Sequence, residues 1–230
     1  MRVPDYPSAD ANRWSAVDGY FAELLAPSDS HLNSTLAENA VSGLPPHDMS
    51  ALQGKMLALF VKMVNASRVL EIGTLGGYST IWMARALPEN GCVVTIEANA
   101  DHANVARGNI SKAGIADRVD LRVGKALDVL PTLDGTFDLI FIEADKPNNP
   151  SYLKWALRLS RPGTAIIGDN VVRGGAVIDA TSEDANVRGV REFLQMMSVE
   201  PRLSATAIQT VGEKGWDGFV LAIVGPADSQ

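Results

Sequence analysis

From Arg68 onward, short apolar runs alternate with segments in which apolar residues recur at helical spacing. The runs have the length and composition of strands buried on both faces of a parallel sheet. The pattern predicts strands at 69–72, 93–97, 119–123, 139–142, 164–167, 204–210 and 219–224. It predicts helices between them at 79–87, 101–113, 126–130, 152–159 and 187–199. Repeated strand–helix units with short connections favour a doubly wound α/β fold with a mostly parallel, seven-stranded sheet.

The two ends of the chain complete this fold. The last two strands are separated by 212–218, which contains turn residues, so we expect a C-terminal antiparallel hairpin. Near the N-terminus, helical spacing predicts helices at 14–25 and 31–42 and a third that begins at Asp48 or Ser50. These helices are expected to cover the strand ends. We predict a single domain made of a loose arm (1–13), N-terminal helices (14–66) and a Rossmann-like core (67–230).

Composition narrows the class of protein. The chain has 230 residues, a formal net charge of −7 and no basic stripe, which argues against a nucleic-acid partner. Its apolar stretches are too short for a membrane span, and its N-terminus lacks the apolar region of a signal peptide. Cys92 is the only cysteine, which excludes an intramolecular disulfide and a cysteine-based zinc site. We therefore expect a cytoplasmic protein that acts on small molecules.

Polar side chains gather where two of the predicted strands end. One apolar run stops at Glu143, Asp145 and Lys146, and a later run stops at Asp169 and Asn170. Ligands in open α/β sheets bind just beyond the carboxyl ends of the strands. The sequence therefore places oxygen ligands and a lysine on one edge, where a hard divalent cation and a proton acceptor could act together.

A glycine-containing turn follows the first predicted strand. Gly73, Gly76 and Gly77 let the backbone turn sharply and approach a ligand closely, although a tight strand–helix connection would need no more than this. The turn lacks the G-x-G-x-x-G pattern of dinucleotide-binding proteins. Glu97 ends the next strand, where a carboxylate can accept both ribose hydroxyls, and Ala126 could border an adenine ring. A solvated acid at a strand end remains the alternative for Glu97.

Several segments together resemble one family. RVLEIGTLGGYSTIWMARAL, Glu97, VGKALDVLP, FDLIFIEADKPNNPSYLKWALRLSRPG and IIGDNVVRGGAV occur in the order and spacing of metal-dependent class I O-methyltransferases of the caffeoyl-CoA and catechol type. The resemblance covers about residues 14–225 and is greatest to the compact bacterial members.

The resemblance implies S-adenosylmethionine as cofactor and assigns residues to it. Contacts would come from Met49, Ser50, Glu71, Gly73, Tyr78, Ser79, Glu97, Ala126 and Glu143. A divalent cation, magnesium in the first instance with calcium or manganese as alternatives, would be held by Glu143, Asp169 and Asn170. Lys146 would be the general base, because a nearby cation favours the neutral form of a lysine.

The implied reaction moves a methyl group to one hydroxyl of a catechol-like phenol. A cation stabilises a phenolate by the same effect that acidifies metal-bound water. The family usually has Asp where this chain has Glu143, and the extra methylene moves the carboxylate by roughly an ångström, enough to affect catalytic geometry.

The sequence also leaves two alternative functions open and suggests partners. A nicotinamide-dependent oxidoreductase would use a related sheet, but the missing G-x-G-x-x-G pattern argues against it. A cofactor-binding protein with weak or no turnover is the second alternative, because of Glu143. We expect a homodimer, from the resemblance and the apolar N-terminal helices. The acceptor is expected to contact those helices and the 173–186 loop.

Overall fold

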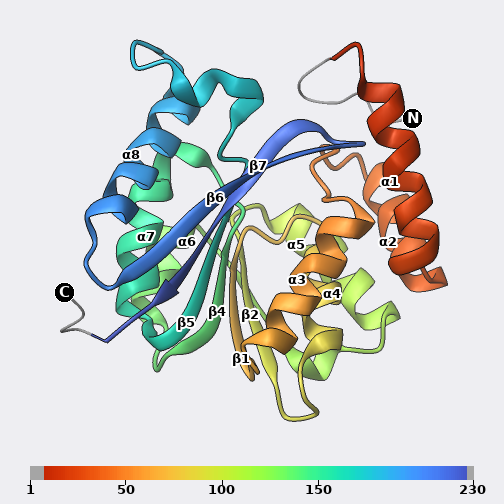
Figure 1. Cartoon of the computed structure of the whole chain (residues 1–230). Helices are drawn as coiled ribbons and strands as arrows, with labels where there is room; N and C mark the ends of the chain where they lie inside the picture. Colours follow the sequence, from red (N-terminus) through yellow and green to blue (C-terminus); the bar gives the residue numbers. More distant parts are fainter. Residues whose placement is uncertain (1–7, 227–230) are drawn as a thin grey trace.

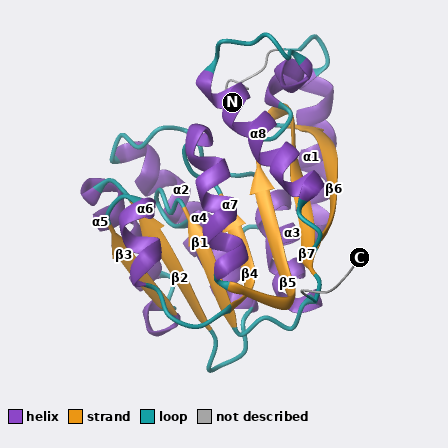
Figure 2. Ribbon diagram, turned by 90° about the vertical axis from the view of Figure 1, so that its left-hand side faces the viewer, coloured by secondary structure: helices purple, strands orange, loops and turns teal. Residues whose placement is uncertain are grey.

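A single mixed sheet runs through the middle of the protein, with helices on both of its faces (Figures 1 and 2). The computed structural model describes residues 8–226. The strands lie in the order β3-β2-β1-β4-β5-β7-β6, and β7 runs antiparallel to both of its neighbours, β5 and β6. Their bounds are β1 Arg68–Ile72, β2 Cys92–Glu97, β3 Val119–Val123, β4 Phe137–Ile142, β5 Ser160–Asp169, β6 Leu203–Gly212 and β7 Gly215–Val224.

The helices form two layers. The longer ones are α1 Ala11–Leu25, α2 Ser30–Val41, α3 Ala51–Met63, α4 Tyr78–Ala86, α5 Ala100–Lys112, α7 Asn149–Arg158 and α8 Ala185–Val199. The short ones are α6 Ala126–Val129 and the 3-10 turns η1 Ala116–Arg118, η2 Leu130–Thr132, η3 Lys146–Asn148 and η4 Arg173–Ile178. Buried side chains of α3, α4 and α5 pack on one face of the sheet, and those of α6, α7 and α8 pack on the other.

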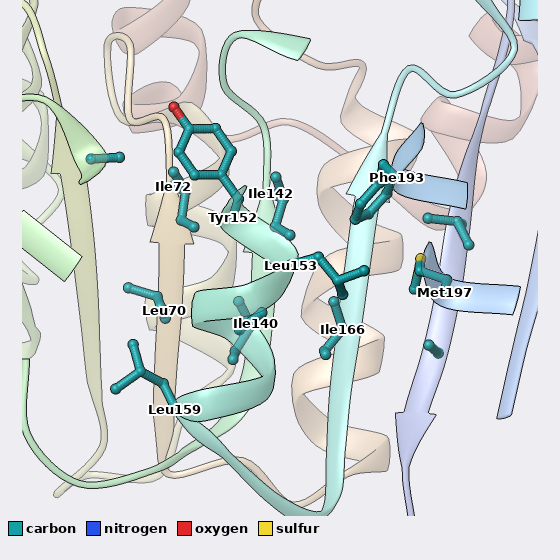
Figure 3. Packing of buried hydrophobic residues seen from close by; sticks show 14 of the residues in the cluster. Leu70, Ile72, Ile140, Ile142, Tyr152, Leu153, Leu159, Ile166, Phe193 and Met197 are labelled. Carbon is teal, nitrogen blue, oxygen red and sulfur yellow. The ribbon is translucent and has the colours of Figure 1, made fainter. Parts of the chain in front are cut away.

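The central strands are apolar without interruption because both of their faces are covered. In β4, Ile140 and Ile142 point to the layer of α7 and α8, where they meet Leu153 and Phe193 (Figure 3). The alternate residues of β4, such as Phe141, belong to the cluster on the opposite face. Successive side chains of a strand point to opposite faces of the sheet, so a strand that is covered on both faces has apolar residues at every position. The prediction of buried parallel strands is therefore confirmed.

The predicted hairpin is present, but its turn is much shorter than residues 212–218. Gly212 pairs with Gly215, so two residues make the turn and β7 begins at Gly215. The sequence pattern assigns Gly218 to the turn, but in the structure this residue lies inside β7. A Cβ on Gly218 would come within 2.2 Å of the Ile208 carbonyl oxygen, so this glycine permits close packing between strands.

The N-terminal segment also differs from the prediction. Helix α1 begins at Ala11, so the last three residues of the predicted arm 1–13 are helical, and its first seven lie outside the described residues. Helix α3 packs on a face of the sheet through Leu57 and Val61, because these side chains join the buried cluster there. Asp18 of α1 and residues 47–50, before α3, lie beyond the strand ends, where they line a cavity together with strand-end residues. Among residues 8–226, no helix is both long and apolar enough to cross a membrane.

The sheet register brings four strand ends to one edge. Ile72 of β1 is paired with Ile96 of β2 and with Ile142 of β4, and Ile142 is paired with Gly168 of β5. The residues that follow these positions in the chain therefore leave the sheet side by side. They include Gly73, Glu97, Glu143 and Asp169.

Candidate active site

One large cavity opens at this edge of the sheet. Its volume is about 1370 Å³, and its walls come from the ends of β1, β2, β4 and β5, from α1, and from the loops around them. Of the residues predicted for the site, those in the cavity wall are Met49, Ser50, Gly73, Tyr78, Ser79, Glu97, Ala126, Glu143, Lys146, Asp169 and Asn170. The structure thus brings together residues that are up to about half the chain apart in sequence.

Gly73 allows the ends of β1 and β4 to lie in direct contact. Its φ is +101°, and a Cβ there would lie 2.0 Å from the carbonyl oxygen of Glu143. No larger side chain fits without moving one backbone away from the other. The glycine therefore sets the turn after β1 directly against the segment that carries Glu143.

Glu97 holds the turn in its observed shape. Its Oε2 accepts hydrogen bonds from the backbone N–H groups of Thr74 (3.2 Å) and Leu75 (2.8 Å), and its Oε1 accepts one from Asn99 (2.9 Å). The Nδ1 atom of His102 lies 3.7 Å from the same carboxylate, and His102 also lines the cavity. A carboxylate held by backbone donors is fixed in place beside the cavity.

Met49 and Ser50 form another wall. Ser50 is the N-cap of α3, where its hydroxyl accepts from the Gln53 N–H and the Gln53 side chain accepts from the Ser50 N–H. This capping box fixes the start of the helix next to the cavity. Met49 belongs both to the wall and to the buried cluster on that face of the sheet.

Glu71 lies behind the cavity wall rather than in it. Its side chain is completely buried between β1 and α4, and its carboxylate accepts hydrogen bonds from the hydroxyls of Ser79, Thr80 and Thr95 at 2.5–2.7 Å. Burial raises the pKa of Glu71 to about 7 despite these donors. Glu71 therefore supports Ser79, which does line the cavity, and its predicted direct contact with a cofactor stays a prediction.

The opposite end of the cavity is rich in charge. Lys146 is only 7% exposed, and its Nζ lies 3.0 Å from Oε2 of Glu143. Burial, together with the charge of Glu143, raises the pKa of Asp169 to about 7. Asn170, whose φ is +57°, donates its backbone N–H to Asp169 Oδ1 at 2.9 Å. The residues predicted to hold a cation thus share one pocket wall with the predicted base.

Asp145 binds two other polar side chains of the same segment rather than Lys146. Its carboxylate accepts from the Tyr152 hydroxyl and from the Asn148 amide, both at 2.5 Å. Burial and the charge of Asp145 raise the pKa of Tyr152 above its usual value. All three residues line the cavity, and they brace η3, the turn that begins with Lys146.

The loop after Asn170 is held by β7. The Asp217 carboxylate accepts the backbone N–H groups of Val172 (2.9 Å) and Arg173 (3.1 Å), and the indole of Trp216 packs against Gly175. Asp217 and Arg173 both line the cavity. Sequence reasoning missed Asp217 and His102. Asp217 gives no local signal, since antiparallel pairing of β7 with β5 brings it there, whereas His102 could have been found from its position on the helix that follows Glu97.

The fold and the cavity define a class I methyltransferase architecture, with a glycine turn and an acidic strand end at one side and acidic and amide side chains at the other. The family model described as O-methyltransferase matches residues 26–223. The chain belongs to the O-methyltransferase family, as the sequence motifs predicted.

Individual relatives cover nearly the whole chain. A catechol O-methyltransferase from Mycobacterium tuberculosis is 54% identical over 209 residues, which are 90% of this chain and 94% of that protein. The crystal structure of an O-methyltransferase from Bacillus cereus in complex with S-adenosylhomocysteine has a TM-score of 0.92 and 56% identity, covering 93% and 99% of the two chains. The O-methyltransferase TomG from Streptomyces achromogenes, in complex with S-adenosylmethionine, has a TM-score of 0.92 and 48% identity, covering 95% and 100%.

The buried carboxyl of Glu71 predicts a pH-dependent contribution to stability. A carboxyl whose pKa is higher in the folded chain favours folding at low pH, and this contribution is lost as the pH rises from about 4.5 through 7. We expect the free energy of unfolding of the wild type, relative to that of Glu71→Gln, to fall by up to about 3 kcal/mol between pH 4.5 and pH 8. Denaturant unfolding of both proteins at several pH values measures this, and a difference that does not change with pH would contradict it.

Proposed function

We propose that this protein transfers a methyl group from S-adenosylmethionine to one hydroxyl of a catechol-like small molecule. The observation that carries the proposal is that one cavity joins the turn at Gly73 and the carboxylate of Glu97 to Glu143, Lys146 and Asp169. The relatives named above include a catechol O-methyltransferase and structures that contain the cofactor or its demethylated product. A nicotinamide-dependent oxidoreductase is disfavoured by the family match.

At the cofactor end, backbone and carboxylate groups would recognise the nucleoside and the amino-acid portion. Glu97 faces the cavity beside the turn and would accept the ribose hydroxyls. Ala126, the first residue of α6, borders the position proposed for the adenine. Ser79 and Tyr78 begin α4, so the first turn of that helix would meet the methionine end, where a helix N-terminus favours negative charge.

The opposite end fits a hard divalent cation by the chemistry of its donors. Glu143, Asp169 and Asn170 offer two carboxylates and an amide oxygen, which are the ligands that magnesium and calcium prefer. Among residues 8–226 no group of three or more His, Cys, Asp or Glu side chains is arranged to hold a metal, so the amide would be needed as a ligand. Burial raises the pKa of Asp169 and the charge of Glu143 raises it further, and a cation there would relieve that repulsion. When bound, such a cation would stabilise the negative charge on the acceptor oxygen.

Lys146 would take the proton from the acceptor hydroxyl. In the proposed step the oxygen forms a bond to the methyl carbon, the carbon–sulfur bond breaks, and the hydroxyl proton goes to Nζ of Lys146. Because Nζ lies 3.0 Å from Glu143, the lysine and the cation would share that carboxylate. The acceptor would be a small molecule, rather than a nucleic acid or a membrane surface, and the cytoplasm is the compartment proposed.

An assay with a panel of vicinal diphenols tests this function. We expect labelled methyl transfer in the presence of magnesium and S-adenosylmethionine, and loss of most of that transfer in Lys146→Met, because the proton acceptor is gone. A loss of about 10²-fold or more is expected. Binding of S-adenosylhomocysteine by Lys146→Met serves as the control for folding. Cofactor binding by the wild type without transfer to any diphenol would reject the catechol proposal.

A second experiment separates a working site from a binding protein without turnover. We expect Glu143→Asp to keep or raise the rate of methyl transfer, because a shorter carboxylate still supplies oxygen ligands. Glu143→Gln should lose at least about tenfold in rate, since it removes the charge that both the cation and Lys146 would use. Rates measured across magnesium, manganese and calcium give the comparison. If Glu143→Asp, Glu143→Gln and the wild type are all inactive with every metal, the protein has no turnover.

We also propose that the protein is a homodimer. Helix α1 has no buried residue in the isolated chain, and its Tyr20, Leu24 and Leu25 side chains are 62%, 59% and 64% exposed. Strand β6 is an edge strand of ten residues without a charged side chain, and most of it is exposed. Exposed apolar helix faces and uncharged sheet edges are usually covered in stable proteins.

Light scattering coupled to size exclusion measures the dimer directly. The wild type should elute with twice the chain mass of 24.5 kDa. Leu25→Glu is expected to shift the mass toward the monomer, because it places a charge on the exposed face of α1. Val41→Glu is the matched control, since Val41 is 87% exposed but lies on α2. A wild-type monomer would overturn the proposal.

A further inference from the structure

A buried network of amide side chains lies beneath the cofactor end of the cavity. Asn39 of α2 is 1% exposed and donates from Nδ2 to Oδ1 of Asp48 at 2.7 Å. Its Oδ1 accepts from Nδ2 of Asn109, on α5, at 2.9 Å. The same Asn109 nitrogen donates to the carbonyl oxygen of Gly76, also at 2.9 Å. The Asn39 and Asn109 amides therefore link two helices, the segment before α3 and the turn after β1.

Asn39 is also packed directly on the turn. A Cβ on Gly76 would lie 1.9 Å from Oδ1 and 2.2 Å from Nδ2 of Asn39. Gly76 does not have a positive φ, so its backbone conformation does not itself require glycine. The requirement comes from the Asn39 side chain, which occupies the space that any larger residue would need.

The two groups that Asn39 connects belong to different walls of the cavity. Asp48 lines the cavity together with Met49 and Ser50, and residues on both sides of Gly76 line the facing wall, among them Leu75 and Tyr78. Fixing the distance between these walls fixes the space between them. We propose that Asn39 is a positioning residue for the cofactor: it holds the turn at Gly76 and the segment at Asp48 at the separation that the cofactor needs. The identity of the ligand rests on the proposed function.

Attachment of α2 does not depend on this amide. Leu32 of the same helix is buried in the cluster with α4 and α5, and surface ion pairs join Glu38 to Lys112 and Asp29 to Arg85. Burial of a polar side chain costs more free energy than burial of an apolar one of the same size, unless each polar group has a hydrogen-bond partner. An amide at this position can donate to Asp48 and accept from Asn109 at the same time, which an apolar side chain cannot do.

A double-mutant cycle tests the proposal with the full chain. Calorimetry would measure the dissociation constant of S-adenosylhomocysteine for wild type, Asn39→Ala, Gly76→Ala and the double variant. We expect each single change to weaken binding about tenfold or more, since shifts of about an ångström in a site have effects of this size. The double variant should bind no more weakly than Asn39→Ala alone, because removing the amide also removes the clash. Additive losses, or wild-type affinity in Asn39→Ala, would overturn the proposal.

Glu38→Gln is the matched control. Glu38 is the neighbour of Asn39 and joins the same two helices through Lys112, but it lies at the surface. It should leave the affinity for S-adenosylhomocysteine unchanged. The KM for the methyl acceptor should change little in Asn39→Ala, whereas a general loosening of the fold would raise both constants. If Asn39→Ala does not fold, Asn109→Ala carries the same expectation for binding, because it removes the amide that joins Asn39 to the Gly76 carbonyl.

Failure of this inference can be told apart from failure of the proposed function. Binding is measured without any acceptor, so it does not depend on turnover. If the wild type does not bind S-adenosylhomocysteine, the proposed function fails and Asn39 has no cofactor to position. If the wild type binds and the variants bind equally well, only the role of Asn39 is rejected.

Discussion

The contact between Gly73 and the Glu143 carbonyl is the constraint on which the site depends. A Cβ at Gly73 would come within 2.0 Å of that oxygen, so the exits of β1 and β4 can touch only because position 73 has no side chain. Parallel pairing of β1 with β4 brings the strands together, and the glycine lets their ends stay together beyond the sheet. Glu143 and the turn at Gly73 are neighbours in the cavity wall for this reason.

Charge in the cavity is arranged so that its two ends differ. Asp169 and Glu143 lie close enough to raise the pKa of Asp169, and Lys146 supplies part of the compensating positive charge. Glu97, in contrast, is held by three backbone N–H groups and keeps its carboxylate in a fixed position. The first arrangement places two carboxylates beside a lysine, and the second holds a single carboxylate rigidly beside the cavity.

Local sequence signals predict the helices and strands and the residues at the strand ends. Strands that are buried on both faces give uninterrupted apolar runs, and the end of each run marks the end of its strand. Local signals do not account for Asp217, which reaches the cavity through antiparallel pairing of β7, or for the true length of the hairpin strands. Gly218 was counted with the turn because a glycine required for close strand packing has the same appearance in sequence as a turn glycine. The contact of Glu71 with a ligand stays a prediction of the family resemblance, and the sequence gives its strand but not the hydroxyls that surround its carboxylate.

The N-terminal helices do more than cover the strand ends. Any segment that excludes water could serve as a cover, whereas Asn39 of α2 contacts the turn that Glu97 also holds. Gly76 accepts a hydrogen bond from Asn109 of α5 through its carbonyl, and its missing side chain makes space for the Asn39 amide of α2. Glu97 binds the N–H groups of the two preceding residues, Thr74 and Leu75, so the two supports act on consecutive residues of one turn.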